Sequence, residues 1–397
     1  DERSIQPVEV EELIGVHNGV VANELELLQY VGMRTSVIDS EIPLHLIKRF
    51  GLQRAFSMCT GGYAYAYADS QNGDLVLLRN FKTLAIGSVG NNLLFASEQS
   101  FLEEVFGYTY IPHKLPPYHY AKYRLGRLIE SGVVSCKTDS YLPEQDPNRV
   151  LVCASGGIDS TVSAYCIKRM WQKEVELVHF SYGQKAKDNE WTAVEAIASD
   201  LQAQLHRIEL PWLGKLGRSA LTETSIEHPG SIKQAIAGTK MWVPARNLVF
   251  IASLMAIAEA IGAAYISAGW TLETEGSYPD NSVEFLRALN LISDVGTLMR
   301  PKLVMPLQRL MKPEEIVLGM DLGVDFSKTW SCDQGYEKQC GWDSACFEHH
   351  YCFVRAGVPD PTDYLNPPSF SHKISLSIGN VGSLKEIKRR VTLDALT

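Results

Sequence analysis

The sequence predicts an α/β protein of two domains: an N-terminal α+β sandwich, followed by a doubly wound domain with a parallel sheet. At 397 residues the chain is too long for one ordinary core. Short strand patterns dominate its N-terminal part, whereas from residue 150 apolar runs alternate with long helical segments. We therefore place the domains at residues 1–112 and 149–360, with a connector over 113–148 and a C-terminal tail over 361–397.

Alternating and periodic apolar residues define the elements of the first domain. They predict strands at 14–19, 62–68, 75–78 and 93–96, and helices over 24–30 and 42–50. We expect the first strand to end in a turn at Gly19, and residues 71–74 to form a hairpin turn. The segment that follows is rich in Pro, Tyr and Lys, so it is expected to wrap the surface as a connector.

In the second domain, strands and helices alternate. The continuous apolar run at 150–154 is typical of a parallel strand that is buried on both faces. The pattern predicts further strands at 175–180, 206–210 and 264–268, and helices over 160–171, 189–201 and 248–261. This alternation predicts a doubly wound sheet.

The composition narrows the class of protein. A hydrophobic content of 45% with 21% charged residues is typical of a soluble globular chain. The net charge of -9 argues against broad electrostatic binding to nucleic acid. The longest apolar run, near residues 248–264, is interrupted by Ser253 and Glu259, and the N-terminus has no apolar signal segment. We therefore expect a cytoplasmic protein that does not contact membranes; homo-oligomerisation stays open.

A glycine- and hydroxyl-rich segment follows the strand at 150–154 directly. It consists of Ser155, Gly156, Gly157, Ile158, Asp159, Ser160 and Thr161. Glycines let backbone N–H groups approach an anion, and the start of the next helix favours negative charge. The Asp159 carboxylate would suit Mg²⁺ bound to phosphate oxygens. A turn that merely connects strand and helix is the alternative, but the full motif in this context favours an ATP site.

This motif resembles the PP-loop ATPases, which cleave ATP between its α- and β-phosphates and adenylate a substrate oxygen. Further blocks resemble the 7-cyano-7-deazaguanine synthase (QueC) family, in the family's order, over roughly residues 148–360. They are Ser181–Gln184, Val243–Asn247, Tyr278–Asp280 with Glu284 and Phe285, Lys312–Ile316, Thr329–Cys332 and Gly357–Asp360. In the fourth block, Met311 replaces the family's Thr.

The resemblance implies an ATP-dependent carbon–nitrogen ligase. Such an enzyme adenylates 7-carboxy-7-deazaguanine, lets ammonia displace AMP to give an amide, and dehydrates the amide to a nitrile after a second activation. It implies catalytic roles for Asp159, Arg246 and Lys312, and it adds Tyr182 and Gln184 to the ATP site. Tyr278, Asp280 and Glu284 would bind the deazaguanine substrate.

Half of the eight cysteines crowd into one segment. The QueC resemblance implies structural Zn²⁺ at Cys332, Cys340 and Cys346, with Asp343 where the family has a further cysteine. A carboxylate can bind zinc, although three cysteines and one aspartate are an unusual set. Cys352, His349 and His350 lie near in the sequence and are candidates to substitute. A degenerate site that is held by packing alone is the alternative.

The N-terminal segment at 16–23 resembles the class II glutamine amidotransferases, as do Gly61–Ala66 and Phe95–Glu98. There Asn18 and Gly19 would form an oxyanion hole, and Asp39 would bind the α-amino group of glutamine, the ammonia donor. In that family an N-terminal cysteine attacks glutamine, but here no cysteine precedes Cys59. We expect either that upstream sequence was removed or that the domain is a remnant without glutaminase activity.

Three further hypotheses stay open at this point. Archaeosine-type enzymes convert a 7-cyano-7-deazaguanine in tRNA or DNA to an amidine, with the same two domains. An asparagine-synthetase-like ligase shares the domain order and the nucleotide loop. A non-catalytic homologue in a modification or defence complex would explain the missing nucleophile. The sequence does not decide whether the acceptor is a free base, tRNA, DNA or a protein.

Overall fold

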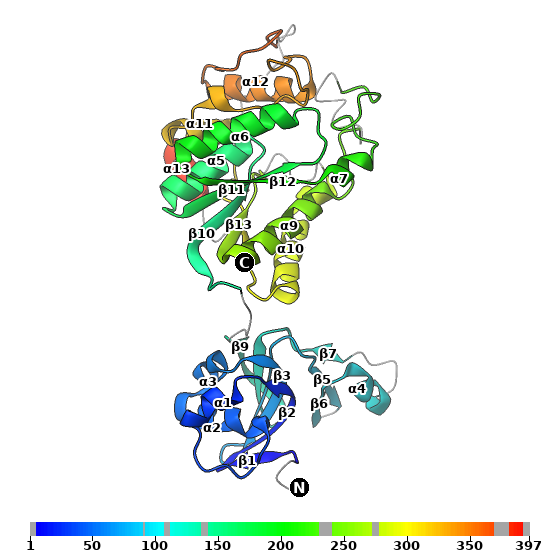
Figure 1. Cartoon of the computed structure of the whole chain (residues 1–397), viewed down its shortest axis with the longest axis vertical. Helices are drawn as coiled ribbons and strands as arrows, with labels where there is room; N and C mark the ends of the chain where they lie inside the picture. Colours follow the sequence, from blue (N-terminus) through cyan, green and yellow to red (C-terminus); the bar gives the residue numbers. More distant parts are fainter. Residues whose placement is uncertain are drawn as a thin grey trace. The chain divides into compact units, whose positions relative to one another are not determined.

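In a computed structural model, the chain forms two compact units, Asp1–Tyr141 and Leu142–Thr397 (Figure 1). The structure describes residues 5–89, 92–106, 112–135, 142–229, 240–271, 278–368 and 381–391. Within these ranges, no helix has the length and apolar character needed to cross a membrane. Each unit has its own sheets and its own hydrophobic core.

The first unit contains two antiparallel sheets. The larger one has the order β1-β2-β3-β4-β8-β9, and the smaller one has the order β6-β5-β7. The strands are β1 (Val8–Val10), β2 (Leu13–Val21), β3 (Gly61–Asp69), β4 (Asp74–Arg79), β5 (Ala85–Val89), β6 (Asn92–Ala96), β7 (His113–Lys114), β8 (His119–Arg124) and β9 (Arg127–Val133). The helices are α1 (Glu24–Leu27), η2 (Leu28–Tyr30), η3 (Asp39–Glu41), α2 (Ile42–Phe50), α3 (Leu52–Met58) and α4 (Gln99–Phe106).

Alternation along β3 explains this sandwich. Tyr63 and Tyr65 point to one face of the larger sheet, where they pack with Leu44 of α2 and Phe56 of α3. Ala64 and Ala66 point to the other face and pack with the smaller sheet. The predicted α+β sandwich is therefore confirmed.

Two expectations for this unit need correction. The strand expected to end at Gly19 continues to Val21, because all of its residues from Leu13 onward pair with β3. The expected connector over 113–148 contains β7, β8 and β9, which belong to the sheets of the first unit. Tyr120 and Tyr123 are buried in that unit, which explains the aromatic content of the segment.

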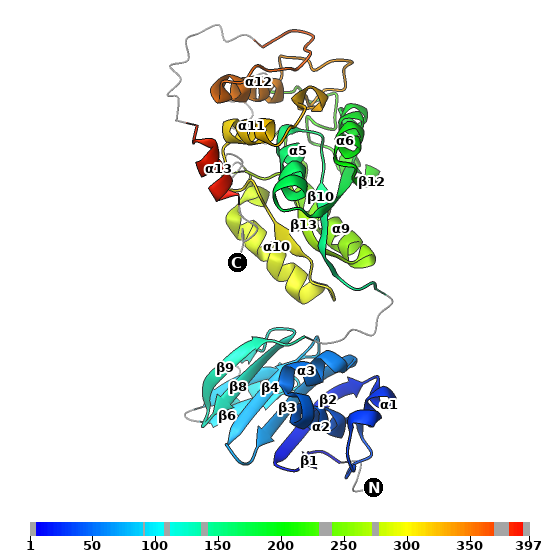
Figure 2. The ribbon, with the colours of Figure 1, turned by 90° about the vertical axis from the view of Figure 1, so that its left-hand side faces the viewer.

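The second unit is built on a parallel sheet with the order β12-β11-β10-β13-β14 (Figures 1 and 2). Its strands are β10 (Asp146–Cys153), β11 (Glu174–Ser181), β12 (Gln204–Glu209), β13 (Ala263–Ser267) and β14 (Lys302–Val304). Its helices are α5 (Ile158–Tyr165), η4 (Cys166–Met170), α6 (Lys187–Leu201), α7 (Pro211–Lys215), α9 (Arg246–Ile261), η5 (Pro279–Asn281), α10 (Val283–Gly296), α11 (Lys312–Asp321), η6 (Phe326–Lys328), α12 (Ser344–Ala356) and α13 (Leu384–Arg390).

The middle strand β10 is buried on both faces, as its continuous apolar run predicts. Val150 and Val152 pack on the face that α5, α6, α11, α12 and α13 cover. Leu151 packs on the face that α9 and α10 cover. The doubly wound fold is therefore confirmed, and the predicted tail contributes α13 to its core. Because the sheet is parallel, the loops after β10, β11 and β13 meet at one edge, where such folds bind ligands.

Candidate functional site

The loop between β10 and α5 turns sharply around two glycines. Gly156 has a φ of +79°, and a Cβ atom there would lie 2.8 Å from Ala193 Cβ. The hydroxyls of Ser160 and Thr161 donate to Gly157 O at 3.2 and 2.7 Å. The first N–H groups of a helix have no partner within the helix, so those at the start of α5 are candidates to bind an anion.

A further glycine, which the sequence analysis did not single out, lets the loop approach β13. A Cβ atom on Gly269 would lie 2.5 Å from Ser160 N and 2.6 Å from Asp159 C. Gly269 follows β13 along the chain, so the close approach depends on how two distant strands pack. No local sequence signal could have indicated this role.

The cationic side chain of Lys312 faces the loop between β10 and α5. Lys312 Nζ, at the start of α11, lies 3.8 Å from Asp159 Oδ2 and 3.2 Å from Glu348 Oε1. Burial opposes the charge on Lys312, but the nearby carboxylates outweigh it and raise its pKa well above the usual value. Burial raises the pKa of Asp159, and Lys312 opposes that rise. Lys312 therefore stays charged beside the loop.

These groups line a cavity of about 370 Å³ at the carboxyl edge of the sheet. The predicted site residues in its wall are Ser155, Gly157, Ile158, Asp159, Ser160, Tyr182, Gln184, Arg246 and Lys312. Five residues predicted to bind ATP or substrate in this unit are not in the wall: Gly156, Thr161, Tyr278, Asp280 and Glu284. The wall also includes residues that the sequence analysis did not assign: His179, Glu190, Asn247, Trp270, Asn281, Asp333 and Glu348.

Arg246 and Tyr182 form the second polar part of the wall. Arg246 Nη1 donates to Tyr182 Oη at 3.2 Å, and the guanidinium lies 5.8 Å from the centre of the Tyr182 ring. Burial raises the pKa of Tyr182 to about 12, with the Arg246 charge opposing it. Tyr182 is therefore a neutral partner that orients the guanidinium.

Gln184 is held by the protein itself. Its Oε1 accepts from Tyr182 N at 2.8 Å, and its Nε2 donates to Phe180 O at 3.1 Å and to Glu190 Oε2 at 2.8 Å. Gln184 thus shapes the turn that presents Tyr182. Burial raises the pKa of Glu190 to about 7, although the Gln184 hydrogen bond lowers it.

The segment predicted to bind substrate reaches the cavity through Asn281. Asn247 Nδ2 donates to Asn281 Oδ1 at 3.0 Å, and both asparagines line the wall. Asp280 is buried beside them, where burial raises its pKa and Arg246 opposes the rise. Tyr278 packs on Trp242 with ring centres 5.5 Å apart, and Glu284 is exposed in the first turn of α10.

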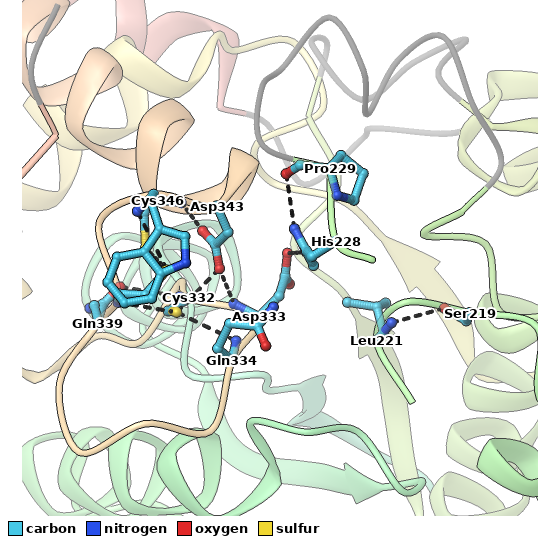
Figure 3. Close-up of polar contacts among 12 residues, drawn as sticks. Ser219, Leu221, His228, Pro229, Cys332, Asp333, Gln334, Gln339, Asp343 and Cys346 are labelled. Carbon is cyan, nitrogen blue, oxygen red and sulfur yellow. Dashed lines mark hydrogen bonds and ion pairs between the residues drawn. The ribbon is translucent and has the colours of Figure 1, made fainter. Parts of the chain in front are cut away.

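The cysteine cluster is compact and well provided with hydrogen bonds. Ligand atoms of Cys332, Cys340, Asp343 and Cys346 all lie within 4.8 Å of one another, and all four residues are buried. Cys332 Sγ accepts from Gln334 N (Figure 3) and from Cys340 N, each at 3.4 Å. Backbone N–H groups that point at sulfur favour thiolates, and three thiolates with one carboxylate fit a four-coordinate metal such as Zn²⁺.

Asp343 has two tasks in this cluster. Its Oδ1 accepts from Cys346 N at 2.7 Å and so caps α12, and its Oδ2 accepts from Asp333 N at 3.1 Å (Figure 3). His349 and His350 are occupied elsewhere. His349 Nδ1 lies 2.7 Å from Ser331 Oγ, and His350 Nδ1 lies 2.7 Å from Asp360 Oδ2. Within the described ranges, neither these histidines nor Cys352 joins the cluster, so the idea that they substitute is not supported.

The segment that carries Cys332 also closes the cavity. Trp330 N donates to Gly156 O at 2.8 Å, and Ser331 and Asp333 line the wall. Asp333 Oδ2 in turn lies 2.8 Å from His228 Nε2 (Figure 3). A backbone hydrogen bond therefore links the segment that carries Cys332 to the loop between β10 and α5.

With this geometry in place, comparison with known proteins decides the family. The model of the "queuosine biosynthesis protein QueC" family matches residues 149–357, which is more than half of the chain. The chain belongs to the QueC family. The expected loop, the Arg246 and Lys312 blocks and the cysteine cluster all fall within the QueC match.

Some relatives of this QueC chain match both units, and others match about half of the chain. A 7-cyano-7-deazaguanine synthase of Saccharolobus solfataricus is 36% identical over 382 residues, which cover 91% of this chain and 80% of the relative. One of Sulfolobus acidocaldarius is 32% identical over 378 residues, with the same coverage. One of Methanothermobacter thermautotrophicus is 34% identical over 221 residues, covering 54% of this chain and 99% of the relative.

The first unit matches a second family model, "glutamine amidotransferase domain", over residues 1–104. A solved glutamine phosphoribosylpyrophosphate amidotransferase of B. subtilis is 16% identical at a TM-score of 0.28, covering 93% of this chain and 83% of that one. That score is too low to support any statement about the site.

Three predicted residues lie together in this amidotransferase-type unit. Asn18 and Gly19 are exposed on β2, and Asp39 lies in η3 beside the end of that strand. Asp39 Oδ2 accepts from Val21 N at 2.6 Å. The buried His17 Nδ1 lies 3.1 Å from Ser40 Oγ, and burial lowers the pKa of His17 despite the Asp39 charge. Asn18, Gly19 and Asp39 therefore share one region of this unit.

Proposed function

We propose that this QueC-family chain is an ATP-dependent carbon–nitrogen ligase that acts on a 7-deazaguanine. The carboxylate of 7-carboxy-7-deazaguanine attacks the α-phosphorus of ATP, and pyrophosphate leaves. Ammonia displaces AMP and loses a proton to give the amide. The amide oxygen is then adenylated by a second ATP, and loss of AMP and a proton leaves the nitrile.

One observation carries this proposal. A single cavity combines the loop at 155–161 with two cations, Lys312 and Arg246. N–H groups and a lysine suit the charge of a leaving pyrophosphate, and a guanidinium suits a carboxylate. The name 7-cyano-7-deazaguanine synthase of relatives that match both units supplies the substrate class.

The residues of the wall have distinct roles in this proposal. Lys312 stabilises negative charge on the phosphates, and Arg246, oriented by Tyr182, holds the substrate carboxylate. Asp159 is the carboxylate that would hold Mg²⁺, which neutralises phosphate charge when bound. Cys332, Cys340, Asp343 and Cys346 would hold Zn²⁺ as a structural ion.

The amidotransferase-type unit suggests the nitrogen source. Asn18 and Gly19 would stabilise an oxyanion on glutamine, and Asp39 would bind its α-amino group. The first cysteine of the sequence, Cys59, is buried in the core of this unit and is not placed to attack glutamine. Glutamine and free ammonia are both nitrogen sources to test.

The proposal is tested by incubating the full chain with ATP, Mg²⁺ and ammonium, and with one acceptor at a time. Mass spectrometry should find the nitrile from 7-carboxy-7-deazaguanine, together with AMP and pyrophosphate. An amidine from 7-cyano-7-deazaguanine would indicate the archaeosine-type reaction, and AMP formation only with aspartate an asparagine-synthetase-like ligase. Absence of AMP with every acceptor would favour the non-catalytic homologue.

A further inference from the structure

The first turn of α11 carries a buried carboxylate, Glu314, whose partners lie in that turn and in the C-terminal segment. Glu314 is 5% exposed, and its Oε2 accepts from Met311 N at 3.1 Å in a capping box. Its Oε1 accepts from Gly382 N at 3.3 Å and forms an ion pair with Arg390. Two of these partners come from the C-terminal segment, which lies beyond the residues that the QueC model matches.

The C-terminal helix α13 is packed firmly against α11. Ile387 is fully buried, and Val391 is 5% exposed; both belong to the same core cluster as Ile316 of α11. At the other end of α11, Lys388 Nζ lies 2.6 Å from Asp321 Oδ2. Figure 2 shows α13, in red, beside α11. The ion pairs of α13 are therefore accompanied by buried apolar side chains. An ion pair on an exposed surface alone would contribute little to stability.

The same turn of α11 contributes Lys312 to the wall of the cavity at the carboxyl edge of the sheet. Lys312 is the first residue of the helix, and Glu314 is the third, so the two side chains leave the turn in different directions. The Lys312 ammonium faces Asp159 and Glu348. Lys312 and Glu314 therefore leave the same turn of α11, one toward the cavity and the other toward α13.

We propose that α13 is a positioning element of the nucleotide site, in which Arg390 acts through Glu314 to hold Lys312 against the loop after β10. Arg390 itself touches no substrate; it is a positioning residue. The inference rests on the proposed use of ATP. It assigns a role to residues 381–391 that the family match does not include.

The test compares two substitutions on the same helix. In the full chain, Arg390→Met removes the charged partner of Glu314, and Lys388→Met removes an ion pair at the far end of α11. We expect Arg390→Met to raise the KM for ATP about tenfold in pyrophosphate release, with Lys388→Met within about twofold of the wild type. Arg390→Lys should restore most of the loss, because it returns the charge.

Several outcomes would contradict the inference. Equal KM values for the two Met variants, or a loss of thermal stability in Arg390→Met with an unchanged KM, would give α13 only a structural role. If Arg390→Met does not fold, Glu314→Gln keeps the size of the side chain and must raise the KM in the same way. A wild-type chain that releases no pyrophosphate would instead overturn the proposed function itself.

Discussion

The Lys312 ammonium lies 3.8 Å from the Asp159 carboxylate, which brings the start of α11 to the loop after β10. We expect Lys312→Met to lower the rate of pyrophosphate release about 10²- to 10³-fold, because a preorganised cation is lost where charge develops. Lys302→Met, which removes an exposed lysine paired with Asp294, is the control and should leave the rate unchanged. Equal effects of both substitutions would remove Lys312 from the site.

The cysteine cluster predicts a bound metal whose affinity depends on Asp343. Asp343→Asn keeps an acceptor for the Cys346 N–H, so the cap of α12 survives while the anionic ligand is lost. We expect metal affinity to fall about 10- to 100-fold and the melting temperature by roughly 5–10 °C. Elemental analysis and thermal unfolding measure both.

Two further variants sharpen the metal experiment. Asp343→Cys should retain the metal, because four thiolates are a common structural zinc set. Asp363→Ala, which changes an exposed aspartate paired with Lys338, should retain both metal and stability. A wild-type chain purified under reducing conditions without any bound metal, and unable to take up Zn²⁺, would contradict the assignment.

The raised pKa of Glu190 predicts that the stability of the folded chain depends on pH. Burial raises its pKa from 4.5 to about 7 in the folded chain. Below about pH 4.5 the Glu190 carboxyl is protonated in both the folded and the unfolded chain. Between about pH 4.5 and 7, only the folded chain holds the proton. The free energy of unfolding therefore falls as the pH rises from about 4.5 to 7. We expect the free energy of unfolding of Glu190→Gln to match the wild type near pH 4.5 and to exceed it by about 3 kcal/mol at pH 8.

Denaturant unfolding at several pH values measures this difference. The exposed Glu195 lies on the same helix, and Glu195→Gln is expected to show no such trend. A constant difference between Glu190→Gln and the wild type at every pH would show that Glu190 titrates normally.

Asn281 and Glu284 are two candidates to contact the substrate, and they differ in whether they line the cavity. Asn281 lines the cavity and is held by Asn247, whereas Glu284 is exposed and outside the wall. We expect Asn281→Ala to raise the KM for the deazaguanine acceptor about tenfold, with the KM for ATP nearly unchanged. Glu284→Gln should change neither value. The reverse pattern would restore Glu284 as the substrate contact that the sequence suggests.

The sequence is informative where function depends on contiguous residues. The loop at 155–161 and its flanking strand and helix could be predicted, because the chemistry and the local structure share one segment. Gly269 and Glu348 reach the same cavity from distant parts of the chain, so only the packing of β13 and α12 brings them there. The strands β8 and β9 were not predicted, because β9 is exposed along most of its length and β8 has adjacent buried residues, so neither shows a clean alternation.

The hydrogen bond from Trp330 N to Gly156 O joins the segment that carries Cys332 to the loop after β10, so we expect metal binding and nucleotide binding to be coupled. Coupling free energy between two ligands is reciprocal, so if the metal tightens nucleotide binding by some factor, the nucleotide must tighten metal binding by the same factor. Loss of the metal would then weaken nucleotide binding by that same factor.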